Sequence, residues 1–195
     1  MATIVVPFRS GGKSRLPEEI RLEAALAMLG DVLEASAAYG DRVRLVTDDV
    51  AAVHVAAEIG VEVVADPGGG QGAAVRAALA GIDGVCLVVN ADLPRTCPSD
   101  LAALAVPSLA GAVAIVAARD GTTNALGLPF AELFQPLYGP GSAARFGASA
   151  AALGLAVDDL ELPNLRDDVD TADDLERVGL RAGARTRAFV TLLRA

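Results

Sequence analysis

Short apolar runs alternate with segments of helical periodicity through the first two-thirds of the chain. Several of the runs are apolar throughout and rich in Val and Ile, which is typical of strands that helices cover on both faces. The predicted strands are Thr3–Val6, Arg42–Val46, Glu62–Ala65, Val85–Val89 and Ala112–Ala117. The predicted helices between them are Glu19–Ser36, Val50–Ile59, Ala73–Ala80 and Ser99–Ala105. This alternation predicts a three-layer α/β fold with a mostly parallel sheet.

The pattern loosens after residue 118 but still predicts further elements. These are a helix over Ala143–Leu153, a strand over Ala156–Leu162, a helix from about Ala172 and an amphipathic surface helix over Ala184–Leu193. We expect Asp170 or Thr171 to cap the helix at Ala172. In the first helix, four leucines fall on one stripe: Leu22, Leu26, Leu29 and Leu33. No repeat or linker divides the 195 residues, so we expect one domain over residues 1–195.

Polar or glycine-rich loops follow the first four predicted strands. Because ligands bind beyond the carboxyl ends of parallel strands, these loops should converge on one site. Their sequences are Arg9-Ser10-Gly11-Gly12-Lys13-Ser14-Arg15, Thr47-Asp48-Asp49, Asp66-Pro67-Gly68-Gly69-Gly70-Gln71-Gly72 and Asn90-Ala91-Asp92-Leu93-Pro94. The second loop is best explained as a cap of the next helix, and we assign it no catalytic role.

The first loop is cationic in a chain of net charge −9. It carries Arg9, Lys13 and Arg15, and Lys13 is the only lysine of the protein. Cations beside the backbone amides of Gly11 and Gly12 suit a polyphosphate, although the two glycines could also form a simple turn. If the loop binds phosphate, the substitution Lys13→Ala should reduce catalysis by orders of magnitude and leave folding intact.

The third loop ends in Gln71-Gly72 at the start of an Ala-rich helix. A glycine there lets the backbone approach a flat or anionic ligand, and we favour this interpretation over a merely flexible loop. The sequence matches neither the G-x-G-x-x-G fingerprint nor a Walker A loop.

Asp92 is the leading candidate for chemistry. It follows an apolar strand, Pro94 prevents that strand from continuing, and a carboxylate beside phosphate-binding loops is where magnesium would be recruited. The alternative is a turn or capping aspartate. Asp168 precedes Asp170 by two residues, so it can point back toward the sheet edge as a second metal ligand facing Asp92.

A second anion site is predicted further along the chain. Hydroxyl and amide donors surround Thr123, and Tyr138-Gly139-Pro140-Gly141-Ser142 precedes a helix whose first backbone amides are free to bind an anion. Two anion sites separated by a carboxylate indicate two phosphorylated substrates that meet at a metal ion.

The composition excludes several classes of protein. Charges interrupt every apolar run before the length of a membrane span, and no signal peptide is evident, so we expect a cytoplasmic protein without membrane contact. The acidic balance argues against nucleic-acid binding through a broad basic face. Two cysteines and one histidine argue against a structural zinc site and a Ser-His-Asp triad. Ala-rich helix faces would permit a homodimer.

The motifs, taken in order, resemble a known family. They are Val6-Pro7, Gly12-Lys13-Ser14-Arg15-Leu16, Asp66-Pro67-Gly68, Asn90-Ala91-Asp92-Leu93-Pro94, Thr123-Asn124-Ala125-Leu126, Tyr138-Gly139-Pro140-Gly141-Ser142 and Asp168-Val169-Asp170-Thr171. Together they resemble the guanylyltransferases that activate 2-phospho-L-lactate or phosphoenolpyruvate for the synthesis of the deazaflavin coenzyme F-420. The resemblance covers nearly the whole chain.

This resemblance implies a GT-A-like, Rossmann-type nucleotidyltransferase fold and magnesium-dependent transfer of GMP from GTP to the acid, with release of pyrophosphate. By position, Arg9, Lys13 and Arg15 would contact the GTP phosphates. Asp92 and Asp168 would hold the metal. The carboxylate or phosphate of the three-carbon acid would bind at Thr123, Gly139 and Ser142.

The chain departs from the family pattern in three places. The first loop is short, with Arg9 where a lysine is common; Gln71-Gly72 replaces a familiar Leu-Asn; and Phe146 stands where the family often has His. Two alternatives therefore stay open at the level of sequence. One is a nucleotidyltransferase with a molybdopterin- or sugar-phosphate-type acceptor, and the other is a non-catalytic GTP-binding module. A panel of nucleotides and acceptors would discriminate among them.

Overall fold

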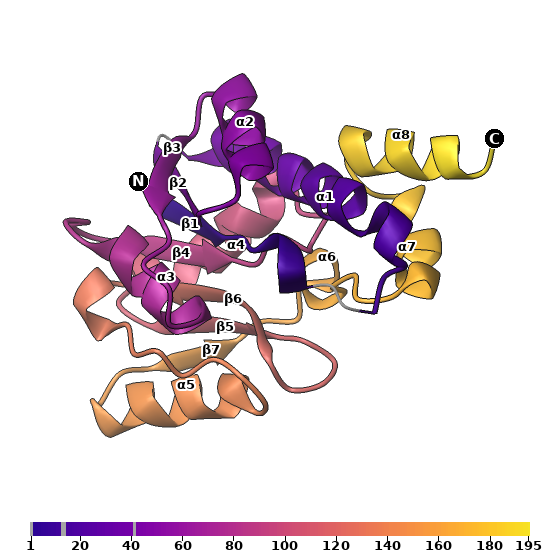
Figure 1. Cartoon of the computed structure of the whole chain (residues 1–195). Coiled ribbons are helices and arrows are strands. Elements are labelled where there is room, and N and C mark those ends of the chain that lie inside the picture. The colour runs from indigo at the N-terminus through magenta and orange to yellow at the C-terminus, as the bar shows by residue number, and fades with distance from the viewer. Residues whose placement is uncertain (1, 13–14, 41) are drawn as a thin grey trace.

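The computed structural model describes residues 2–12, 15–40 and 42–195. Within these ranges, seven strands form one sheet in the order β3-β2-β1-β4-β6-β5-β7 (Figure 1). The strands are β1 (Thr3–Pro7), β2 (Arg42–Thr47), β3 (Glu62–Ala65), β4 (Cys86–Val89), β5 (Val113–Ala117), β6 (Thr123–Leu128) and β7 (Val157–Asp159). Only β6 among them runs against the others, because it pairs antiparallel with both β4 and β5. The predicted mostly parallel α/β sheet is confirmed.

Helices cover both faces of this sheet (Figure 1). The α-helices are α1 (Glu18–Tyr39), α2 (Val50–Ile59), α3 (Gln71–Leu79), α4 (Pro98–Leu109), α5 (Ser142–Ala152), α6 (Pro163–Arg166), α7 (Ala172–Gly179) and α8 (Ala184–Leu193). Two short 3₁₀ helices are η1 (Ser10–Gly12) and η2 (Ala131–Leu133). Within the described ranges, no helix combines the length and apolar character that crossing a membrane requires.

Alternate residues of each central strand face two separate cores. Ile4 and Val6 of β1 pack with buried side chains of α1, α2 and α4, whereas Val5 packs with those of α3 and α5. All three side chains are fully buried. This period of two explains why the central strands read as apolar throughout, since neither of their faces meets water.

Two predicted helix caps can be compared with the structure. Asp49 caps α2, because its Oδ1 accepts a hydrogen bond from the Ala52 amide at 3.0 Å. Thr171 rather than Asp170 caps α7, and its side chain accepts from the Asp174 amide at 3.2 Å. Asp170 is therefore not the cap of this helix.

The structure corrects three details of the predicted secondary structure. β6 was not predicted as a strand, because its sequence contains Asn and Gly. The glycine is explained by packing: a Cβ at Gly127 would lie 2.6 Å from the Ser108 Oγ, so α4 lies directly on the glycine backbone. The strand expected over Ala156–Leu162 is reduced to β7, whose Asp158 and Asp159 are exposed. Leu22 lies 45% exposed, outside the buried stripe to which it was assigned.

Hydrogen bonds join the C-terminal helix α8 to α1. The buried Asp31 of α1 accepts hydrogen bonds from the backbone amides of Arg185 and Thr186, each at 2.9 Å. Burial raises the pKa of Asp31 above its ordinary value, and the hydrogen bonds from Thr186 and Arg185 oppose that shift. The carboxylate satisfies amides at the start of α8 that no carbonyl of that helix could reach.

Candidate active site

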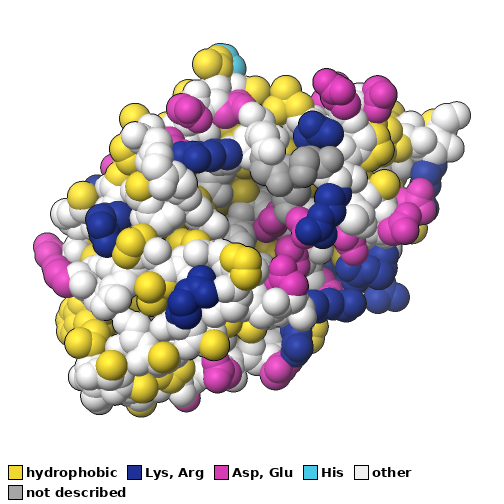
Figure 2. Space-filling view, turned by 60° about the horizontal axis from the view of Figure 1, so that its bottom comes forward, with side chains coloured by type: hydrophobic (Ala, Val, Ile, Leu, Met, Phe, Trp, Pro, Cys, Tyr) yellow, Lys and Arg dark blue, Asp and Glu magenta, His cyan; other side chains and the backbone are white. Residues whose placement is uncertain are grey.

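A cleft of about 260 Å³ opens where the loops after β1, β3 and β4 meet. Polar lining residues come from all three loops: Arg9, Asp66, Gln71, Asn90 and Asp92. On the face drawn in Figure 2, acidic side chains gather beside a hollow, and basic side chains surround them. The predicted convergence is therefore confirmed for three of the four loops, and the described residues that line the cleft include none from Thr47-Asp48-Asp49.

Arg9 lies in this cleft and forms a bidentate ion pair with Asp66. Its Nε donates to Oδ2 at 2.6 Å and its Nη2 donates to Oδ1 at 2.9 Å. The Gly68 amide also donates to Oδ1 of Asp66, at 2.9 Å. The hydrogen bonds from Arg9 hold the pKa of Asp66 below its ordinary value. Arg9 is thus placed at the predicted nucleotide site, but paired with a carboxylate.

The other residues of the first loop that were assigned to the nucleotide site are exposed or lie outside the described residues. Gly11 and Gly12 belong to η1, and Gly11 is exposed. The side chain of Arg15 is 73% exposed, and its Nη1 lies 3.7 Å from Oδ2 of Asp170. Lys13 lies outside the described residues, so its contact with phosphate stays a prediction.

Gln71 and Gly72 open α3 beside the cleft. The Gln71 side-chain amide donates to Asn90 Oδ1 at 2.8 Å, and the Asn90 amide donates to the carbonyl of Thr123 at 3.1 Å. A Cβ at Gly72 would lie 2.5 Å from the Cβ of Pro136. Close packing therefore requires a glycine at this position, whether or not its backbone also contacts a nucleotide.

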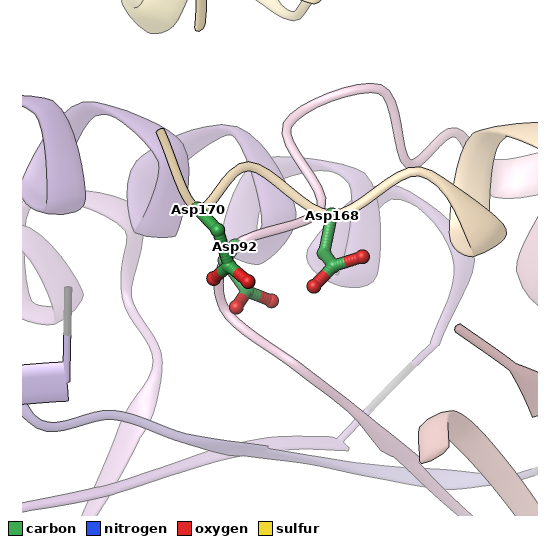
Figure 3. Close-up of side chains that lie close together, drawn as sticks. All are labelled: Asp92, Asp168 and Asp170. Atoms are coloured by element: carbon green, nitrogen blue, oxygen red, sulfur yellow. The ribbon is translucent and has the colours of Figure 1, made fainter. Parts of the chain in front are cut away.

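Three carboxylates converge next to the cleft, as Figure 3 shows. One oxygen from each of Asp92, Asp168 and Asp170 lies within 4.8 Å of the others. Val169, between the last two, is fully buried, and its amide donates to the carbonyl of Asp92 at 3.1 Å. This backbone contact fixes the loop so that Asp168 and Asp170 point the same way. The predicted approach of Asp168 to Asp92 is observed, and sequence reasoning missed the third carboxylate.

The electrostatics of the cluster fit a bound cation. Burial raises the pKa of Asp168, repulsion from Asp92 raises it further, and a hydrogen bond from the Asn124 amide to its Oδ1 at 3.4 Å opposes the shift. Crowded carboxylates repel one another unless a positive charge lies between them. A set of oxygen donors alone suits a hard divalent cation such as Mg²⁺ or Mn²⁺.

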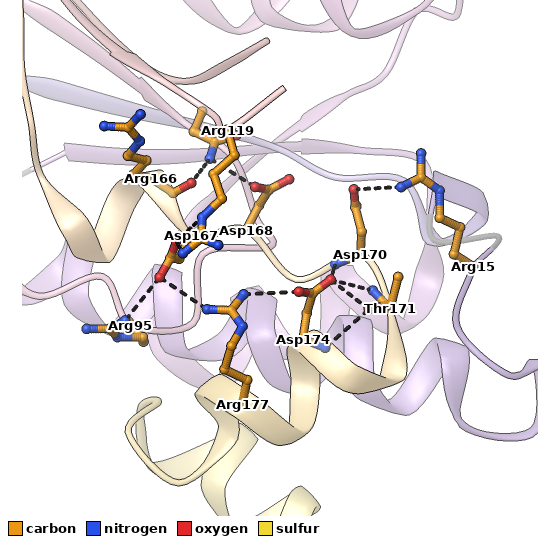
Figure 4. Close-up of polar contacts among 11 residues, drawn as sticks. Arg15, Arg95, Arg119, Arg166, Asp167, Asp168, Asp170, Thr171, Asp174 and Arg177 are labelled. Atoms are coloured by element: carbon orange, nitrogen blue, oxygen red, sulfur yellow. Dashed lines mark hydrogen bonds and ion pairs between the residues drawn. The ribbon is translucent and has the colours of Figure 1, made fainter. Parts of the chain in front are cut away.

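Asp167, the residue before this cluster, is the centre of an arginine network drawn in Figure 4. It pairs with Arg119 at 2.7 Å, Arg177 at 3.2 Å and Arg95 at 3.5 Å. These arginines follow β5, lie in α7 and follow β4, respectively. Arg177 also pairs with Asp174 at 3.0 Å. The network ties the loop that carries Asp168 and Asp170 to three other parts of the fold.

The residues predicted to bind the acceptor meet on the other side of β4. Thr123 and Ser142 are buried, and their hydroxyl oxygens are 2.9 Å apart in a hydrogen bond. Gly139 has a φ of +111°, which a residue with a side chain rarely adopts, and its carbonyl accepts from the Ser142 amide at 3.0 Å. The three predicted residues are therefore adjacent at the start of α5.

The direction of β6 explains how Thr123 reaches the site. Because β6 runs against its neighbours, its first residue lies at the edge where β1 and β4 end. Asn124 follows and donates to Asp168 and to the carbonyl of Arg166, the latter at 3.2 Å. One strand start thus connects the acceptor side to the carboxylates.

Phe146 is a core residue rather than a lining residue of the site. It is 5% exposed and packs against Tyr138, with ring centroids 5.3 Å apart, and against Phe134, with centroids 6.3 Å apart. The departure from a common histidine therefore changes the packing beneath α5.

Solved structures described as nucleotide-diphospho-sugar transferases and nucleotidyl transferases share this fold. A protein from Desulfovibrio desulfuricans G20, described as a nucleotide-diphospho-sugar transferase, superposes with a TM-score of 0.77 over 99% of this chain and 96% of its own, at 17% identity. Glucosyl-3-phosphoglycerate synthase from Mycobacterium tuberculosis, solved with Mn²⁺ and uridine diphosphate, gives a TM-score of 0.63 over 98% of this chain and 78% of its own, at 16% identity.

Sequence comparison narrows this class. The profile described as "Guanylyl transferase CofC like" matches residues 2–194. A phosphoenolpyruvate guanylyltransferase from Nocardia farcinica is 38% identical over 97% of this chain and 89% of its own length. The chain belongs to the CofC-like guanylyl transferase family.

Proposed function

We propose that this protein transfers GMP from GTP to the phosphate of phosphoenolpyruvate, releasing pyrophosphate, in the synthesis of coenzyme F-420. The observation that carries the proposal is the cluster of Asp92, Asp168 and Asp170 between a nucleotide-sized cleft and the Thr123–Ser142 pair. The name of the Nocardia relative favours phosphoenolpyruvate over 2-phospho-L-lactate.

GTP would lie in the cleft with its triphosphate toward the first loop. Arg9, Lys13 and Arg15 would neutralise phosphate charge there, and the amides of Gly11 and Gly12 would donate to phosphate oxygens. At the opposite wall, Gln71 and Gly72 at the start of α3 would contact the nucleoside.

The three carboxylates would hold magnesium. A bound magnesium ion supplies charge stabilisation to the phosphoryl oxygens and to the departing pyrophosphate. The fit rests on the observed donor set, three carboxylates from two loops with like charges in close approach.

The acceptor would bind at the start of α5. The hydroxyls of Thr123 and Ser142, with the backbone amides of the glycine turn at Gly139, would offer hydrogen bonds to the carboxylate or phosphate of a three-carbon acid. Both hydroxyls are buried and already oriented by their mutual bond, so little side-chain entropy is lost when the acid binds.

The reaction needs orientation and charge neutralisation more than proton transfer. An oxygen of the acceptor phosphate attacks the α-phosphorus of GTP, and the bond from that phosphorus to the oxygen bridging the β-phosphorus breaks. The nucleophile is already an anion at neutral pH, so no general base is required. The chain therefore contributes mainly by aligning two polyanions and by stabilising the charge that develops between them.

The test is a coupled assay of pyrophosphate release with GTP, magnesium and either acid. We expect turnover with phosphoenolpyruvate, and a fall of at least about 100-fold in kcat for Asp92→Asn and Asp168→Asn. Asp158→Asn is the matched control, because it makes the same change on the exposed face of β7. Absence of magnesium- and GTP-dependent release with both acids would refute the proposal.

A further inference from the structure

Asp66 lines the cleft and pairs with Arg9, but the proposed reaction gives it no role. We propose that Asp66 reads the guanine base: its two carboxylate oxygens accept the N1–H and N2–H of GTP, and Arg9 holds that position when no nucleotide is bound. The inference rests on the proposed function, since GTP is the donor there, and it assigns the residue that selects the base.

The chemical basis is that guanine contains the same fragment as arginine. Its N1, C2 and exocyclic N2 form a guanidine unit, which presents two parallel N–H donors. Arg9 presents such a fork through Nε and Nη2, and both donors bond to Asp66 at 2.6 and 2.9 Å. Because carboxylates accept this fork in a bidentate manner, a carboxylate that fits the Arg9 fork also fits the guanine edge.

The position of Asp66 is right for a base. Asp66 follows β3, and Asp92 follows β4, three strands further along the sheet. At about 4.8 Å per strand, the two loops are about 14 Å apart, which a nucleotide can span from α-phosphate to base. Asp66 and Asp92 are the carboxylates among the described residues that line the cleft, and Asp92 belongs to the acidic cluster.

Asp66 is held in place independently of Arg9. The Gly68 amide donates to its Oδ1 at 2.9 Å from the same loop, and this hydrogen bond does not involve Arg9. Arg9, in contrast, is 44% exposed, so its guanidinium can move into water or toward the triphosphate at little cost. Guanine would therefore replace a solvent-exposed partner on an acceptor that its own loop holds.

This arrangement would discriminate among bases by their hydrogen-bonding edges. Adenine presents an acceptor nitrogen where guanine has N1–H, and it would face the carboxylate unfavourably. Hypoxanthine keeps N1–H but lacks the amino group. Xanthine keeps N1–H and has a carbonyl at C2, which would be repelled by Asp66 and accepted by an asparagine amide.

The test is Asp66→Asn, titrated with the magnesium complexes of GTP, ITP and XTP by calorimetry and then assayed for transfer. We expect the wild type to bind GTP about 10- to 100-fold more tightly than ITP, as the loss of one charge-assisted hydrogen bond predicts. We expect the variant to lose about 100-fold in GTP affinity and to prefer XTP.

Glu62→Gln is the matched control. Glu62 begins β3, at the end remote from the cleft, and pairs with Arg42 and Arg44 at 3.1 Å each. This substitution removes the same kind of ion pair, so its ratio of GTP to XTP affinity should remain that of the wild type. Thermal melts of both variants monitor folding.

Three outcomes would overturn the inference: a wild-type ratio of GTP to XTP affinity in Asp66→Asn, an equal loss for all three nucleotides, or equal affinity of the wild type for GTP and ITP. If Asp66→Asn does not fold, the wild-type affinities for GTP and ITP alone test the inference. Selective binding of GTP without transfer to any phosphorylated acid would refute the proposed function and support the role of Asp66.

Discussion

Asp167→Asn tests whether the arginine network positions the carboxylates. Asp167 is 13% exposed and holds Arg95, Arg119 and Arg177 at once. The substitution keeps the size of the side chain and removes its charge, so the three guanidinium groups repel one another around the loop. We expect weaker binding of a divalent cation and a lower kcat, with a smaller effect on the KM for GTP.

The magnitude follows from the exposure and the charges. Arg119 is 66% exposed and Arg177 41%, so each of these pairs contributes about 0.2–1 kcal/mol to stability. The pair with Arg95, which is 20% exposed, contributes at the upper end of that range, for a total of about 1.4–3 kcal/mol. With the separation taken as about 10 Å, loss of one negative charge near a divalent cation costs about 0.8–3.3 kcal/mol at an effective dielectric of 80 to 20, or about 4- to 270-fold in affinity.

The assay measures the affinity of each protein for Mn²⁺ by electron paramagnetic resonance, and kcat and KM are measured in parallel. Glu161→Gln is the control, because it makes the same change in net charge and removes an exposed ion pair with Arg166. We expect its Mn²⁺ affinity to stay within about twofold of the wild type, since solvent screens exposed charges. Partial rescue by Asp167→Glu would support positioning. Wild-type cation affinity and kcat in Asp167→Asn would refute the reasoning.

Three further predictions concern stability. Asp31→Ala should lower the free energy of unfolding by about 2–4 kcal/mol in chemical denaturation, because the Arg185 and Thr186 amides lose their acceptor. A loss below about 1 kcal/mol would contradict the role of Asp31 in holding α8. Gly72→Val should lower the melting temperature even without nucleotide, since the Cβ of the valine would meet Pro136. An unchanged melting curve would leave contact with the nucleotide as the reason for the glycine. Arg9 lowers the pKa of Asp66, so this pair stabilises the fold above the ordinary aspartate pKa of about 4, and the contribution is lost as the pH falls through the folded pKa. With Arg9 44% exposed, we expect it to be no more than about 1 kcal/mol. The wild type and Asp66→Asn should differ in stability at pH 7, and the difference should disappear as the pH falls through the folded pKa of Asp66.

The parts of the fold that the sequence predicts are those governed by local pattern. β1, β2 and α2 fall within a residue of their predicted bounds, because their apolar period and their flanking turns agree. β6 escaped prediction since its interior glycine is explained only by the approach of α4, a contact between distant segments. Local propensity cannot report such a contact.

The same division holds for the site. Loops after parallel strands can be assigned to one edge by topology alone, which is how Asp92 was placed there. Asp168 was placed beside it because its spacing of two from Asp170 allows it to point back toward that edge. Asp170 was assigned to a helix cap because Thr171 and Asp170 both suit that role, although its spacing of two from Asp168 offered a signal. The network around Asp167 gave no sequence signal, because its arginines come from three separate elements.

The reversal of β6 has a consequence for how this activity can diverge. Base selection would depend on residues before the reversal, such as Asp66, and acid selection on residues after it, such as Thr123 and Ser142. Groups on separate elements, more than about 10 Å apart and without shared partners, usually contribute additively to binding. Gln71 and Thr123 share Asn90 as a partner, so changes at those two positions should couple. Changes at Asp66 and Ser142 could be made one at a time, so a lineage or a designer could exchange either substrate there while the carboxylates between them stay in place.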